Sequence, residues 1–239
     1  MTQNQDNPNP PPPPPGGPDR GNPYAQHAQA AADRAKVAAQ DALGVARRLL
    51  GNPVGGIGPA HAGLTQDRAL GVALVFALVA AIGLALAGGS LVRSMMGAAM
   101  GAYGAMPGFG FGFNFGQFLK AVLGNLIMIA AAGGGVLLFA PLLGGRTNPV
   151  SALLVSATAF LPLGIAALLA AIVGWLFKSQ FGAILVGLLM LYGLCYLVLT
   201  LNAGLRHVAG VDEGRAALGT PTVLAFAMLV MWLVGKLLG

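Results

Sequence analysis

The sequence predicts an all-α, polytopic helical membrane protein: five transmembrane helices, a disordered Pro-rich N-terminal tail and one amphipathic N-terminal helix. Of the 239 residues, 56% are hydrophobic and 8% are charged, and the mean hydropathy is +0.75. A soluble domain usually carries about 25% charged residues. The charged residues beyond position 69 stand between long uncharged intervals. Such a chain suits a bilayer better than a water-exposed surface.

The first 23 residues are mostly Asn, Gln, Gly and Pro, with an unbroken proline run over 10–15. A segment of this composition cannot bury enough apolar surface to fold, so a disordered tail is predicted for residues 1–23. The proline run alone forms a stiff polyproline II rod of about 19 Å. Two interpretations of this rod stay open, a solvated spacer and a ligand for an aromatic-lined groove of a partner.

An amphipathic helix is predicted over residues 24–50, because apolar residues recur there at heptad a and d spacing with polar residues opposite. Its apolar face is mostly alanine, which offers little area for insertion into lipid. We therefore expect weak contact with the membrane surface, or packing against a partner. A flexible Gly and Pro linker is expected over residues 51–68. The apolar face consists of Ala28, Ala31, Ala35, Ala38, Ala42, Val45 and Leu49.

The transmembrane domain is predicted over residues 69–239, because each of its five uncharged intervals contains an apolar stretch near the ~20 residues that cross a bilayer core. Pro221 shortens the last span unless it lies in the first helical turn. The predicted spans are 69–89, 119–143, 150–176, 181–203 and 219–237.

The connection between the first two spans, residues 94–118, is uncharged and rich in Phe and Gly. Its seven glycines would make a poor helix, at about 1 kcal/mol each relative to alanine, so a sixth span is rejected. Alternate phenylalanines from Phe109 to Phe115 would lie on one side of an extended chain. We expect a loop at the membrane interface; a re-entrant gate and a self-associating patch are the alternatives.

Lysines and arginines near the span ends predict the orientation. The bias is modest, and it favours a cytoplasmic N-terminus and an outer C-terminus in a multi-pass protein of the cell (inner) membrane. Trp175 and Trp232 would then anchor the same outer interface. The inner side would hold Arg68, Arg146, Arg206 and Arg215, and the outer side Arg93, Lys120, Lys178 and Lys236.

No enzyme is indicated, and no catalytic residue, cofactor or metal ligand is expected. No predicted span carries an ionisable Asp, Glu, His, Lys or Arg near its middle, where function inside membranes usually shows. The single cysteine excludes an internal disulfide, and no phosphate-binding loop or H-E-x-x-H pair is present. The scattered bases do not suit nucleic acid. The histidines His27, His61 and His207 lie far apart in the sequence and are expected at the surface.

Two polar groups remain as candidate sites. Tyr192, Tyr196 and Thr200 lie four residues apart on the fourth span with Cys195 beside them, so they form one stripe, which either lines a cavity or binds neighbouring helices. The loop 204–217 is the one dense polar cluster between spans, and it either starts a short helix or contacts a cytoplasmic partner. Its candidate contact residues are Arg206, His207, Asp212, Glu213 and Arg215.

Three stretches resemble motifs of the Ypt-interacting-protein (YIP) family, the Ypt/Rab-interacting proteins with five spans, in their bacterial branch; the resemblance covers about residues 69–237. They are the 144 GG 145 turn after the second span, 153 LLVSATAFLPLGI 165 with its Leu-Pro, and 196 YLVLTLNAGLRHVAGVDEGRAAL 218. The resemblance implies five helices, a cytoplasmic N-terminal region and an outer C-terminus. For eukaryotic members it also implies binding of Rab-type GTPases, but their acidic Tyr-Gly-Pro signature has no counterpart in 61 HAGLTQDRAL 70.

The first functional hypothesis is a non-enzymatic scaffold or membrane-organising protein. Its partners would be the lipid bilayer and a cytoplasmic protein bound by the N-terminal helix and the loop 204–217, with a homo-oligomer as a further interaction. The alternative is a transporter or channel component for an uncharged or lipid-like substrate, whose path is lined by the Tyr192 stripe and a bend at Pro162.

Overall fold

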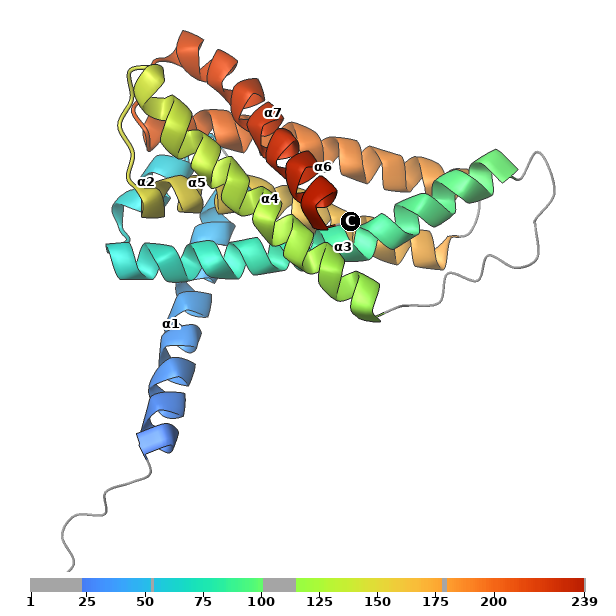
Figure 1. The fold of residues 1–239 in the computed structure, drawn as a ribbon, viewed down its shortest axis with the longest axis horizontal. Coiled ribbons are helices and arrows are strands. Elements are labelled where there is room, and N and C mark those ends of the chain that lie inside the picture. Colours follow the sequence, from blue (N-terminus) through green and yellow to red (C-terminus); the bar gives the residue numbers. More distant parts are fainter. Residues whose placement is uncertain (1–22, 53, 101–114, 178–179, 239) are drawn as a thin grey trace, which may run out of the picture.

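The computed structural model describes residues 23–52, 54–100, 115–177 and 180–238, and in these the chain is all-α (Figure 1). Five of the helices are long and apolar enough to cross a membrane, as the sequence predicts. The predicted tail, residues 1–23, lies outside the described residues except for Pro23, which begins α1. The helices are α1 (Pro23–Gly51), α2 (Ile57–Ala62), α3 (Gln66–Met100), α4 (Phe115–Leu142), α5 (Pro149–Leu176), α6 (Gln180–His207) and α7 (Glu213–Leu238).

The predicted linker and the predicted interfacial loop both contain helix. Residues 57–62 form α2, and Ile57 is fully buried, so the linker is not uniformly flexible. The loop prediction is wrong for residues 94–100 and 115–118, which belong to α3 and α4. Residues 94–100 contain one glycine among alanines and methionines, which are good helix formers. The rest of that prediction falls on residues 101–114, outside the described residues.

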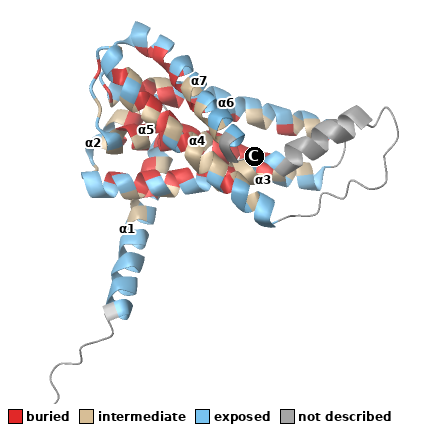
Figure 2. Ribbon diagram, in the orientation of Figure 1, coloured by how far each residue is buried: buried red, intermediate tan, exposed pale blue. Residues whose placement is uncertain are grey.

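Helix α5 is the centre of the bundle, since it packs against α3, α4 and α6. Its start follows from the sequence: Asn148 caps it by accepting a 2.8 Å hydrogen bond from the Ser151 amide, and Pro149 occupies the first turn. Nearly all of its middle is buried, whereas α7 packs mainly on α4 and α6 and is largely exposed (Figure 2). Exposed apolar faces of this kind suit surrounding lipid.

Glycines set the closest helix crossings. A Cβ on Gly164 of α5 would lie 2.9 Å from the Ala80 Cβ and 3.0 Å from the Ala80 carbonyl oxygen of α3. On α4, a Cβ on Gly135 would lie 3.2 Å from the Phe226 ring of α7. That ring meets Phe139 edge to face, with the centroids 5.8 Å apart. The bundle is therefore held by close backbone approach rather than by polar contacts.

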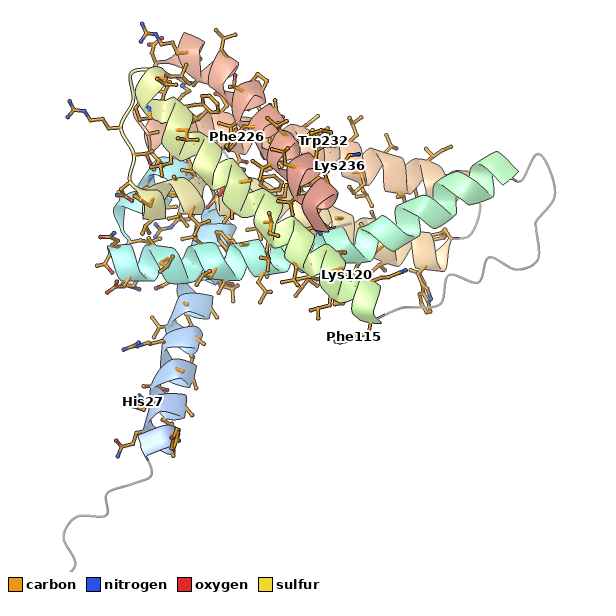
Figure 3. The ribbon with its side chains drawn as sticks, viewed as in Figure 1. His27, Phe115, Lys120, Phe226, Trp232 and Lys236 are labelled. Carbon is orange, nitrogen blue, oxygen red and sulfur yellow. The ribbon has the colours of Figure 1, made fainter. Side chains whose placement is uncertain are left out.

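Helix α1 stands apart from the bundle along its first half. In Figure 1 it runs crosswise to α3 and projects beyond it, and Figure 3 shows His27 on the projecting part. Only its last turns pack, through the buried Ala42, Val45 and Leu49. Val45 and Leu49, the largest side chains of the apolar face of α1, thus pack on the bundle, because they bury more apolar area than alanine does.

Candidate functional site

The polar loop after α6 belongs to one end of the bundle, which we call the α2 end: α2, the turn 143–148 and the loop 208–212. The turn closes α4 in a Schellman motif, with Gly144 at φ 86° and the Gly145 amide donating to the Ala140 carbonyl over 2.8 Å. The Arg146 amide then donates to the Ala209 carbonyl over 2.7 Å. A Cβ on Gly145 would lie 2.6 Å from Val211. Turn and loop are therefore packed backbone to backbone.

The five candidate contact residues lie at this end, but they do not converge on one point. Arg206 pairs with Glu213 at 2.9 Å across the loop. The Arg215 guanidinium donates to the Leu143 carbonyl over 3.4 Å, which ties α7 to the turn. His207 and Asp212 are exposed. An exposed ion pair contributes about 0–1 kcal/mol, so the cluster adds little to stability and leaves a charged surface available for contact.

Helix α2 covers part of this surface, a feature that the sequence analysis missed. It packs on α6, and a Cβ on its Gly58 would lie 3.4 Å from the His207 Cβ. His61, expected at the surface, is half-buried instead, and its Nε2 is buried without a hydrogen-bond partner among the described residues. This burial lowers the pKa of His61 to about 4. His27 and His207 are exposed as expected. The four-residue spacing that puts Ile57 and His61 on one face of a helix is the signal from which α2 could have been predicted.

An ion pair joins α1 to the first turn of α3. The Arg68 guanidinium donates from Nε to Asp41 Oδ2 over 2.7 Å, and its Nη2 contacts Asp41 Oδ1. Arg68 thereby lowers the pKa of the Asp41 carboxyl. A Cβ on Gly71 would meet Ala38 at 3.0 Å, so the two helices are also close beside the pair. No spacing rule connects residues 27 positions apart, and the sequence gave no sign of this contact.

The stripe on α6 runs from the interior of the bundle to its outer surface. Thr200 is buried, and its hydroxyl donates to the Tyr196 carbonyl of the same helix over 2.7 Å. Tyr192 is 61% exposed, Cys195 is exposed, and the two tyrosine rings contact each other with centroids 5.2 Å apart. Residues four apart advance by about 40° around a helix, so the stripe turns away from the interior over its length.

The interior polar groups are mostly satisfied at close range. The Asn125 amide donates to the Ala81 carbonyl over 3.1 Å, and the Ser156 hydroxyl donates to the Leu153 carbonyl over 2.9 Å. Thr158 is the exception: it is fully buried and its hydroxyl has no partner among the described residues. Pro162 follows four positions later and has no N–H to donate to the Thr158 carbonyl. Among the described residues, no group of three His, Cys, Asp or Glu side chains could hold a metal ion.

The fold and these surfaces define a multi-pass integral membrane protein with a helical arm and a polar loop at one end. Comparison with protein-family models, with curated proteins and with solved structures finds no match for this chain. The likeness to the YIP family therefore remains a resemblance carried by three stretches. The structure brings two of them together, since the turn at Gly144 and Gly145 packs against the loop after α6.

Proposed function

We propose that this chain is a non-enzymatic scaffold of the cell (inner) membrane, whose five-helix bundle holds α1 as an arm on the cytoplasmic surface. The observation that carries the proposal is the contrast within α1. Residues 24–37 are all exposed, whereas Val45 and Leu49 are buried and Asp41 is paired with Arg68. A helix whose C-terminal turns pack on the bundle and whose N-terminal half is exposed is suited to bind a second protein.

The placement of α1 follows from the spans. Asp41 pairs with Arg68 in the first turn of α3, so α1 crosses the bundle where that span begins. A helix crosswise to the spans at this level lies along the membrane surface (Figure 1). Its bare face is mostly alanine, which inserts weakly into lipid, and this favours a protein occupant over the bilayer itself. Successive spans cross the bundle in alternate directions. Helix α6 therefore ends at the bundle end where α3 begins, and the α6–α7 loop lies at that end.

Photocrosslinking tests this proposal in intact cells. A photoreactive amino acid replaces one residue at a time along α1, from Ala28 to Ala38, and in the loop at His207 and Gly210. Adducts are expected at one helical face of α1, every three or four positions, with a single protein partner. Leu138 and Met228, exposed on α4 and α7, are matched controls in the bundle. Adducts that form equally at all positions, or at none in α1 and the loop, would contradict the proposal.

A second candidate function is transport of an uncharged substrate, and Thr158 favours it. Its hydroxyl, which has no partner in the described part of the chain, and the carbonyl that Pro162 cannot bond are polar groups in the middle of α5, where a hydroxyl-bearing substrate could take their hydrogen bonds. Flux of small polyols into proteoliposomes tests this, and Thr158→Val should abolish it while Thr222→Val, on the exposed side of α7, should not. Absence of flux in the wild-type protein would reject this candidate.

A further inference from the structure

The outer face of α6 carries polar side chains at a depth where the lipid has no hydrogen-bonding groups. Helix α6 runs from Gln180 to His207, and Tyr192 is 12 residues from its first residue and 15 from its last. At about 1.5 Å per residue, Tyr192 is about 18 Å from the start of α6 and about 22 Å from its end, near the middle of a hydrocarbon core about 30 Å thick. Tyrosines that face lipid are normally found at the two interfaces instead. A tyrosine at mid-depth therefore needs an explanation.

The tyrosine pair cannot satisfy itself. The rings of Tyr192 and Tyr196 contact each other, so one hydroxyl can donate to the other, but the second donor then has no acceptor within the pair. Elsewhere in the described spans, polar side chains away from the ends are buried or bonded within the bundle, as Asn125 and Thr220 are. The hydrocarbon of the bilayer has no hydrogen-bonding groups to offer in their place.

The face around the tyrosines is continuous and open. Large side chains on this side of α6 are exposed over most of the helix, and no atom of the residues that the structure describes lies within 4 Å of where a Cβ on Gly187 would be. A second helix can therefore approach the backbone there. The exposed residues of this α6 face are Phe181, Ile184, Leu188, Leu191, Tyr192, Cys195 and Leu199.

We infer that this α6 face binds a second copy of the chain in a parallel two-fold dimer, in which the tyrosine hydroxyls of the two copies bond each other. A hydroxyl is both donor and acceptor, so the face is complementary to itself, as an isologous interface requires. Two copies of one topology share a symmetry axis along the membrane normal. Identical residues then lie at equal depth, and Tyr192 meets the tyrosines of the second copy while Cys195 comes close to its own counterpart.

Cys195 makes the arrangement testable without adding a cysteine, because the chain has only this one. Oxidation of native membranes with copper phenanthroline, with oxygen as the oxidant, should join two copies through Cys195. The product should run at twice the 24.0 kDa mass on a non-reducing gel and revert on reduction. In a Cys195→Ser background, Leu188→Cys and Leu199→Cys should restore the product. Leu138→Cys on α4, 55% exposed, is the matched control for random collision.

Loss of the hydroxyls tests what holds the two copies together. Tyr192→Phe should weaken dimerisation about 3- to 20-fold in a dilution series in vesicles, read by energy transfer, as expected for hydrogen bonds between membrane helices. Tyr24→Phe makes the same chemical change in α1 and should have no effect. No disulfide through Cys195, equal cross-linking at Leu138→Cys, a product of another mass, or unchanged dimerisation in Tyr192→Phe would each overturn the inference. The absence of photocrosslinks from α1 would leave the dimer inference unaffected, since α1 contributes no residue to the α6 face.

Discussion

A single methyl group at the crossing of α3 and α5 should destabilise the whole bundle. In Gly164→Ala the new Cβ would lie 2.9 Å from the Ala80 Cβ, 3.0 Å from the Ala80 oxygen and closer still to the Ala80 Cα. Carbon atoms pack best at about 3.5–4.0 Å. The obstacle is backbone rather than the end of a flexible side chain, so α3 and α5 must separate by about 1 Å or more.

The cost follows from this displacement. Overpacking of a well-packed core usually costs about 1–3 kcal/mol, and alanine returns up to about 1 kcal/mol because it is the better helix former. A net loss of about 1–2 kcal/mol is expected, which for a chain of this length lowers the Tm by about 2–8 °C. The assay heats purified protein in detergent and measures the fraction that remains monodisperse.

Gly235→Ala is the matched control, because it makes the same change on α7, where none of the described residues has an atom within 4 Å of the added Cβ. Its Tm should stay the same or rise. A Gly164→Ala protein that is as stable as Gly235→Ala would refute the close approach of α3 and α5, and with it the central position of α5.

Three further predictions concern helix α2, the ion pair between α1 and α3, and the topology. Docking of α2 should be strongest above pH 6.5 and weaken towards pH 4, because the buried imidazole of His61, with its pKa lowered to about 4, stays neutral while the imidazole of undocked α2 takes a proton. Hydrogen exchange of α1 and α2 should therefore be faster at pH 5, where the free energy of opening should be lower by up to about 2 kcal/mol. His61→Leu should remove this pH dependence. Asp41→Asn or Arg68→Gln should each increase the mobility of a spin label on α1, by a small amount because exposed ion pairs contribute little to stability, and the double variant should add nothing further; strictly additive effects would mean that the two do not interact. Impermeant thiol labelling of single cysteines in a Cys195→Ala background should alternate from side to side along the chain, and an N-terminus and C-terminus on the same side would exclude five spans. The labelled positions are Gln26, Ser94, Asn148, Gln180, Gly210 and Gly239.

The packing of the small residues shows how far a pattern reaches. Three consecutive glycines in α4, residues 133–135, form a pattern typical of close helix packing, and Gly133 and Gly135 face α5 and α7. The tighter crossing at Gly83 and Gly164 was not singled out, because each glycine stands alone in its own helix. Only the packing of α3 against α5 brings Gly83 and Gly164 to the same crossing.

The sequence by itself determined the class of protein and its candidate spans, because the cost of placing charge in hydrocarbon is paid residue by residue and shows in composition and spacing. It also determined where α1 begins and ends to within a residue or two, from helix formers followed by Gly and Pro. The tertiary structure decided which polar residues face inward, outward or one another. The pairing of Asp41 with Arg68, the burial of His61 and the exposure of Tyr192 each depend on how helices far apart in the chain are rotated and crossed, and no local pattern encodes that rotation.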